Sequence, residues 1–362
     1  MKRQGILLLM ATLFVSYSGM AQNGGGLLDP ELTMYHFQPL SINPALSGNT
    51  NSKWQFGGVW REQAYSISNP FRSAQGYFDL NAPINAWSGN IWGFGLNYVD
   101  DFQGDSRMTN RRVNGTVSIG QYLDARQEHS ISVGFQGGLG FRGIDYSDTY
   151  WDTQWVGQGF NNLAPSGEPE LEDVQGYFDL STGAQYTYYS GDLMELYAGA
   201  AVFHVNRPDV GLYNDTNSTN LQRKTNIHAE FVHRIRDNSM FAIRPTLLYS
   251  RQANRGYLIG GTRFQFLFSE GTRTTGKRSE SSISFGVFTK VASPEYGSKV
   301  DMMGTLSMEF AGFTFGAGYD IPLGSFQMIN GYEGAYEFMI AYRAGYRRGL
   351  YNKYSPSRKG KL

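Results

Sequence analysis

The sequence contains no cysteine, few charged residues and, after its N-terminal region, no long apolar run. The lack of cysteine excludes disulfides, thiolate zinc sites, catalytic thiols and the lipid-bearing cysteine of a lipoprotein. Charged residues make up only 17% of the 362, and the 31 basic residues equal the 31 acidic ones. This balance gives no overall attraction to nucleic acid. Helical membrane spans, which need about 20 nearly uninterrupted apolar residues, are excluded beyond the N-terminal region.

Glycine and aromatic residues are abundant instead. The chain has 45 Gly, 24 Tyr and 24 Phe, and aromatic residues make up 15% of it. This composition is typical of β-structure with many turns.

The N-terminus has the features of a secretory signal peptide. Lys2 and Arg3 are followed by the apolar stretch 6–15, and Ala21 ends a short run of the kind that signal peptidase accepts. We expect residues 1–21 to be removed, with cleavage before Gln22. The alternative is a membrane anchor, but an apolar run of about 10 residues is too short to span a bilayer.

From residue 52 onward the dominant pattern is strict alternation of apolar and polar or small residues. Between Ile131 and Phe141, for example, every second residue is apolar or glycine, which places one set of side chains on each face of a strand. About fourteen such segments are long enough to cross a membrane obliquely. They lie near residues 52–60, 72–80, 91–99, 112–121, 130–141, 174–187, 193–204, 224–235, 240–251, 255–268, 281–291, 298–309, 313–320 and 334–345. The sequence therefore predicts an all-β fold, a transmembrane antiparallel barrel of the outer-membrane type.

The connections predict the orientation and the division of the chain. Long connections near 142–173 and 205–223 follow odd-numbered strands, whereas those after even-numbered strands are mostly short, and long loops mark the outside of such barrels. We expect a periplasmic or plug segment over 22–51, the barrel over 52–345 and a basic periplasmic tail over 346–362.

The strands of a soluble β-sandwich or propeller also alternate apolar and polar residues, so such a fold is the main alternative. Aromatic residues near the predicted strand ends favour the barrel, because such residues form girdles at the two membrane interfaces. They are Trp54, Trp60, Trp87, Trp92, Tyr98, Tyr122 and Tyr342.

No motif predicts a cofactor, a metal site or an enzyme. The glycines of Gly138–Gly143 match a dinucleotide-binding spacing, but they end a strand and do not open a helix. The closest histidines, His228 and His233, are spaced to lie on opposite faces of a strand and cannot share a metal. The common catalytic templates are missing.

The loop 145–173 is acidic and aromatic. It carries seven acidic residues, among them Asp148, and no basic residue, and its aromatic residues include Trp151 and Trp155. Such a loop is either a recognition surface or an ordinary solvated loop over the barrel mouth.

The segment DPELTMYHFQPLSINPALSG (residues 29–48) resembles the opening of the PorP/SprF family, the type IX secretion system membrane proteins of Bacteroidetes. Asp29, Tyr35, Pro39, Asn43 and Pro44 stand at positions typical of the family. The resemblance continues through residues 60–63, 203–208, 319–320, 334–337 and Tyr342, which covers nearly the whole chain after the signal peptide.

The resemblance implies an outer-membrane barrel that works with type IX secretion or gliding proteins and helps a cognate surface adhesin to be exported or anchored. Pro39 and Pro44 predict an extended backbone with few donors, so the segment either docks a partner or plugs the barrel. Partner-contact candidates are Asp29, Tyr35, Pro39, Asn43, Pro44, Asp148, Trp151 and Trp155.

Two other functions compete with this one. A porin or small-molecule transporter would use the lumen of the same barrel, and bilayer conductance separates it from a plugged barrel. An outer-membrane hydrolase has no residue constellation to support it.

Overall fold

The computed structural model describes residues 28–50, 52–63, 70–85, 90–103, 108–144, 150–161, 163–165, 167, 174–190, 193–212, 219–235, 240–269, 281–293, 299–323 and 334–346. The expected signal peptide and the basic tail from residue 347 onward lie outside these residues.

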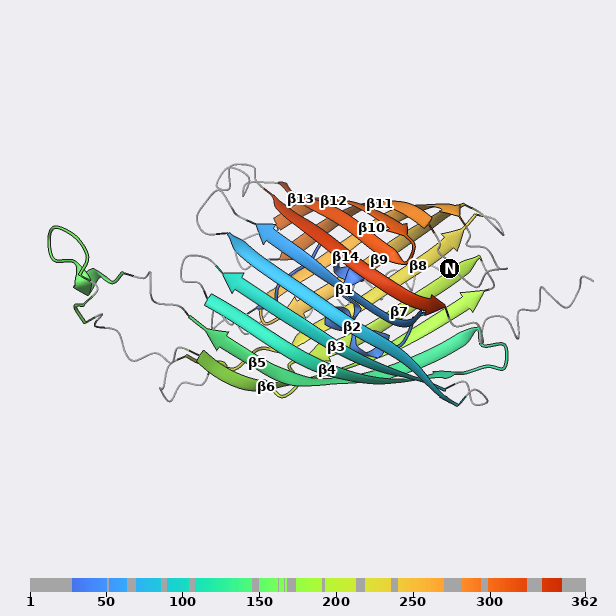
Figure 1. Cartoon of the computed structure of the whole chain (residues 1–362), viewed down its shortest axis with the longest axis horizontal. Coiled ribbons are helices and arrows are strands. Elements are labelled where there is room, and N and C mark those ends of the chain that lie inside the picture. Colours follow the sequence, from blue (N-terminus) through green and yellow to red (C-terminus); the bar gives the residue numbers. More distant parts are fainter. Residues whose placement is uncertain are drawn as a thin grey trace, which may run out of the picture.

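Fourteen antiparallel strands form a closed barrel in which each strand pairs with its neighbours in sequence and β1 pairs with β14 (Figure 1). The strands are β1 (Ser52–Gln63), β2 (Phe71–Asn85), β3 (Asn90–Gln103), β4 (Met108–Tyr122), β5 (His129–Gly143), β6 (Val174–Ser190), β7 (Met194–Phe203), β8 (Lys224–Arg234), β9 (Phe241–Gln252), β10 (Arg255–Ser269), β11 (Ser281–Ser293), β12 (Lys299–Phe310), β13 (Phe313–Leu323) and β14 (Ala335–Tyr346). The predicted fold class and strand number are confirmed.

Several strands extend beyond the predicted segments. The prediction for β2 stops at Leu80, but the strand continues to Asn85, with Asn81 opposite Gly93 and Pro83 opposite Ile91 on β3. Backbone pairing does not require the apolar alternation on which the prediction depended, so strands continue past the end of that pattern.

The wall of the barrel is apolar outside and polar inside. On β5, Phe135 and Leu139 point outward and are 65% and 55% exposed, whereas Ser132 and Gln136 point inward and are buried. A soluble barrel would place its apolar face inside, so this arrangement is that of a barrel in lipid. No helix among the described residues has the length and hydropathy to span a membrane.

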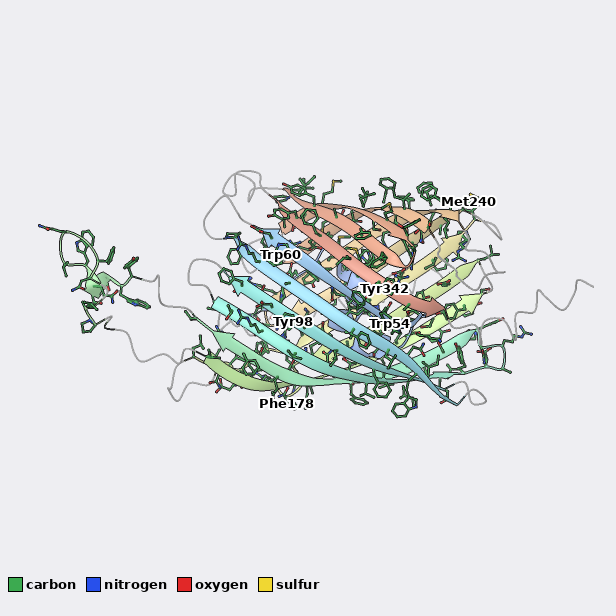
Figure 2. All side chains as sticks on the ribbon, in the orientation of Figure 1. Trp54, Trp60, Tyr98, Phe178, Met240 and Tyr342 are labelled. Carbon is green, nitrogen blue, oxygen red and sulfur yellow. The ribbon has the colours of Figure 1, made fainter. Side chains whose placement is uncertain are left out.

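Aromatic side chains lie on the outer surface towards both ends of the strands. Figure 2 shows Trp54 and Tyr342 near one end of the barrel and Trp60 nearer the other. The rings of Trp54 and Tyr342 are 5.5 Å apart. They fit the aromatic girdles expected of a membrane barrel.

The two ends of the barrel differ in their connections. At one end, here called the long-loop end, 144–173 joins β5 to β6 and 204–223 joins β7 to β8. At the other, here called the short-turn end, β12 and β13 are joined by Ala311 and Gly312 alone, both with the positive φ that a tight hairpin requires. The exceptions to the predicted asymmetry are the two-residue turn 253–254 at the long-loop end and the connection 270–280 at the short-turn end.

Residues 28–50 lie inside the barrel and run from the long-loop end to the short-turn end (dark blue in Figure 1). The backbone N–H of Asp29 donates to Gln252 at the long-loop end of β9, and Asn49 donates to Thr187 near the short-turn end of β6. We call residues 28–50 the luminal segment.

The luminal segment contains three short helical turns, η1 (Tyr35–Phe37), α2 (Pro39–Ile42) and η2 (Pro44–Leu46). The prediction of an extended backbone at Pro39 and Pro44 is therefore wrong. Each proline occupies the first position of a turn, where its missing N–H would have no partner and its fixed φ suits the helix.

Candidate functional site: a barrel lumen filled by the luminal segment

Buried ion pairs hold the luminal segment to the barrel wall. The guanidinium of Arg61 on β1 lies 2.8 Å from the carboxylate of Asp320 on β13 and 2.6 Å from that of Glu337 on β14. The same carboxylates accept hydrogen bonds from the segment. Glu337 accepts the backbone N–H groups of Thr33 and Met34 at 2.6 and 2.7 Å, and Asp320 accepts the Thr33 hydroxyl. The segment is thus tied to three strands at one point.

A second cluster surrounds Asp29 near the long-loop end. Its carboxylate lies 2.7 Å from Arg112, 3.2 Å from His204 and 3.4 Å from Lys224. The other ring nitrogen of His204 lies 2.9 Å from Asp179. Burial alone would raise the pKa of Asp29, but Arg112, His204 and Lys224 outweigh burial and hold that pKa well below its usual range. Asp29 is therefore ionised where it lies.

Further contacts fix both ends of the segment. Glu31 pairs with Lys290 on β11 at 2.7 Å. At the short-turn side, Asp79 on β2 accepts hydrogen bonds from the Ser47 hydroxyl and the Gly48 N–H at 2.9 and 2.8 Å. Barrel carboxylates therefore take up backbone and hydroxyl donors that would otherwise be buried without partners.

Glycines in the wall let the backbone of the segment approach closely. A Cβ atom at Gly134 on β5 would collide with the backbone of Pro44 and Ala45, and one at Gly93 on β3 would collide with the backbone of Ser47. The segment is thus matched to the wall in shape as well as in charge.

Several spaces remain around the luminal segment. A cavity of about 40 Å³ lies beside Asp29 and Gln38. A cavity of about 370 Å³ lies at the short-turn end, where Phe37 and Leu46 line it. The segment fills the lumen between them.

The Asp29 cluster predicts a pH-dependent contribution to stability. The folded pKa of Asp29 is lowered, so its contribution is present above about pH 4 and is lost as pH falls through that pKa. Burial lowers the pKa of His204, but Asp29 and Asp179 raise it more. The contribution of His204 is therefore present below about pH 6.5 and is lost as pH rises through its folded pKa.

We expect Asp29→Asn to cost about 2–3 kcal/mol of unfolding free energy, with the largest cost between roughly pH 4 and 6.5. Urea unfolding in detergent, followed by tryptophan fluorescence, measures the difference at each pH. The control is Asp100→Asn, which removes a partly exposed ion pair with Arg111 and should cost less than about 1 kcal/mol. A cost for Asp29→Asn that does not vary with pH would contradict this account.

The structure brings five of the partner-contact candidates together in the lumen. Asp29, Tyr35, Pro39, Asn43 and Pro44 all lie in the luminal segment; all but Pro39, which lines the cavity at the short-turn end, lie against the barrel wall. The Tyr35 hydroxyl donates to Thr246 on β9, and the Asn43 side chain donates to the Ala184 carbonyl on β6. In this arrangement their contacts are with the barrel itself.

The remaining candidates belong to the loop between β5 and β6. Asp148 lies outside the described residues. Trp151 and Trp155 flank the short helix η3 (Asp152–Gln154), and Trp155 forms an isolated bridge with Phe160. Residues 150–161, here called the arm, lie away from the barrel beyond its long-loop end (Figure 1). Trp155 is 54% exposed and Val156 is 62% exposed.

The barrel residues that hold the luminal segment were not among the sequence candidates. The most important are Arg61, Asp79, Arg112, Asp320 and Glu337. The available signal was a charged residue at an inward position of an otherwise alternating strand. In a soluble β-sheet the polar face of a strand points to solvent, and a charged residue there is ordinary. Only once the barrel is assigned does the same residue point into the lumen and become a candidate contact of the luminal segment.

The fold is similar to several solved structures, each at low sequence identity. CdiB from Acinetobacter baumannii has a TM-score of 0.42 and 8% identity, over 80% of this chain and 60% of CdiB. The CymD monoaromatic hydrocarbon channel has a TM-score of 0.47 and 11% identity, over 86% and 94%. A Pseudomonas aeruginosa FadL homologue has a TM-score of 0.45 and 9% identity, over 84% and 93%. No curated protein sequence matches the chain.

The family comparison is more specific. Residues 25–344 match the family described as type IX secretion system membrane protein PorP/SprF. The match includes the luminal segment and continues into β14, so it covers the cluster around Arg61 as well as the wall. The chain therefore belongs to the PorP/SprF family of type IX secretion system membrane proteins, and its closed barrel with an apolar outer wall is an outer-membrane barrel.

Proposed function

We propose that this protein is a non-enzymatic, plugged barrel of the type IX secretion or gliding machinery that supports export or surface attachment of a cognate large adhesin. The observation that carries the proposal is the luminal segment, which crosses the lumen and is held by the buried ion pairs of Arg61 and Asp29. A barrel whose lumen is filled by its own chain offers no open path to a solute, so its contacts with other proteins are made at its two ends. The partners are then secretion or gliding proteins and the adhesin, with lipid around the wall.

We propose the following division and orientation for the mature protein. Residues 1–21 are a signal peptide, 22–51 form the plug, 52–345 form the barrel, and the basic tail 346–362 lies in the periplasm with the short-turn end. The long-loop end faces the cell exterior, where an adhesin would be held. The connections 144–173 and 204–223 at one end support this orientation.

The alternative function as a porin or small-molecule transporter requires the segment to leave the lumen. Its release would break the contacts that the segment makes with Arg61, Arg112 and Lys224. Because these contacts must be broken before a solute could pass, the filled lumen favours the secretion role.

The arm is the best candidate for contact with the adhesin. Trp155, Val156 and Phe160 are exposed on a unit that is held internally, because Gln154 is buried and donates to the Ala164 carbonyl. Exposed aromatic side chains on a preorganised unit are the residues that most often dominate protein interfaces. Trp151 would belong to the same surface, and Asp148 stays a partner-contact candidate from the sequence alone.

A pull-down in mild detergent from the native outer membrane, followed by mass spectrometry, tests the proposal. We expect a tagged copy to retain type IX components and one large surface protein. We expect Trp155→Ser to lower recovery of that surface protein at least about tenfold, since interface aromatics often contribute 2 kcal/mol or more. The control is Leu123→Ser, an exposed apolar residue in the turn at the other end. Recovery of the barrel alone would overturn the secretion role.

A further inference from the structure

The cavity at the short-turn end is lined by more positive than negative side chains. We call this cavity, of about 370 Å³, the vestibule. Its walls carry Arg234, Arg244, Arg263 and Arg343. Against these four arginines stand three glutamates, Glu195, Glu230 and Glu309. With histidines counted as neutral, the described side chains that line the vestibule leave a single excess positive charge.

One glutamate serves two of the arginines. Glu230 on β8 lies 2.6 Å from Arg244 on β9 and 2.9 Å from Arg263 on β10. The Arg263 side chain is nine-tenths buried, and its Nε has no hydrogen-bond partner within the described part of the chain. A guanidinium presents five N–H donors. This group of three therefore has donors and positive charge in excess.

Arg343 on β14 is a second source of unused donors in the vestibule. Its side chain faces the vestibule, is exposed there, and forms no ion pair or hydrogen bond with any residue that the structure describes. Arg343 is close enough to Arg263 for their charges to repel each other. Nearby, the hydroxyl of Thr314 is buried and lacks a hydrogen-bond partner among the described residues. An unpaired guanidinium and an unused hydroxyl therefore border the same space.

The floor that the luminal segment gives the vestibule is mostly apolar, with His36, Asn49 and Thr50 as its polar members. Phe37, Ile42 and Leu46 of the luminal segment lie below the arginines and close the cavity towards the middle of the barrel. A ligand entering from the short-turn end would thus meet guanidinium groups on the walls and an apolar surface at the bottom.

We propose that the vestibule is a binding site for a single carboxylate carried by a peptide, with Arg343 and Arg263 as its main donors. Guanidinium groups bind carboxylates in a two-pronged arrangement, and one carboxylate neutralises the single excess charge. The apolar floor accommodates a neighbouring apolar side chain of the peptide. A phosphate dianion would exceed the excess charge and would leave the floor unused.

The site does not depend on the secretion role. Only the source of the peptide, a periplasmic protein, rests on the proposed orientation. Failure to recover type IX partners would therefore leave the site untouched, and failure of peptide binding would leave the secretion role untouched.

Calorimetric titration of the full-length protein in detergent tests the site. The probes are an acetylated tripeptide with a central phenylalanine and a free carboxyl end, the same peptide with an amidated end, and inorganic phosphate. We expect the free acid to bind at least about tenfold more tightly than the amide, because charge-assisted hydrogen bonds are lost in the amide. We expect Arg343→Gln to remove most of this difference.

The matched control is Arg251→Gln, an exposed arginine on β9 near the long-loop end, which should bind like the unchanged protein. The migration of heated and unheated samples in SDS gels is compared for each variant, because a folded barrel migrates differently before and after heating. Equal binding of acid and amide, tighter binding of phosphate than of the acid, an unchanged affinity in Arg343→Gln, or no binding of any probe would each overturn the proposal.

Discussion

A Gly134→Val variant is expected to convert a barrel of low conductance into an open channel in planar bilayers. The added side chain would enter the space occupied by the backbone of Pro44 and Ala45. Ser132, two residues earlier on β5, donates to the Ala45 carbonyl at 2.9 Å, so the segment cannot shift sideways without losing this bond. Overpacking of this kind costs about 1–3 kcal/mol, which raises the fraction of molecules whose luminal segment has left its place roughly 5- to 150-fold.

The matched control is Gly115→Val on β4. Gly115 faces outward, and a Cβ there would have its nearest neighbour, the Gly137 carbonyl oxygen, at an ordinary distance of 3.9 Å. This variant should conduct as little as the unchanged protein. If the unchanged protein already shows a large, steady conductance, the luminal segment does not close the barrel and the porin alternative is correct.

The strands and their faces could be predicted because the signal is local. On β5 the alternation of Ser132, Phe135 and Gln136 is complete within one segment and needs no knowledge of other strands. The position of η1, α2 and η2 could not be predicted in this way. These turns are too short for a periodic signal, and what holds them is contact with the wall.

The sequence predicted the residues of the luminal segment that form the site, but not the barrel residues that hold them. Asp29 was a candidate because it belongs to the motif at 29–48, but its partners Arg112, His204 and Lys224 lie on β4, after β7 and on β8. Which inward residues meet in the lumen depends on the register and closure of all the strands between them. No spacing along the chain contains that information.

Arg61→Met is expected to lower the free energy of unfolding by about 3–5 kcal/mol, the usual cost of breaking a buried ion pair from one side. Without the guanidinium, the carboxylates of Asp320 and Glu337 face each other across a buried site. The Thr33 hydroxyl also loses a donor, since Arg61 donates to it at 2.9 Å. Urea unfolding in detergent, measured by tryptophan fluorescence and by heat-modified gel migration, gives the difference.

A second variant separates charge from packing. Adding Asp320→Asn and Glu337→Gln to Arg61→Met removes the two uncompensated charges, so the triple variant should recover at least about half of the lost stability. The single amide oxygen in Glu337→Gln can accept only one of the two N–H groups, of Thr33 and Met34, that the two oxygens of Glu337 accept separately, so the recovery should stay incomplete. If the triple variant is less stable than Arg61→Met alone, the cluster stabilises the barrel mainly through hydrogen-bond geometry. If it is as stable as the unchanged protein, the ion pairs mainly place the luminal segment in one position and add little net stability.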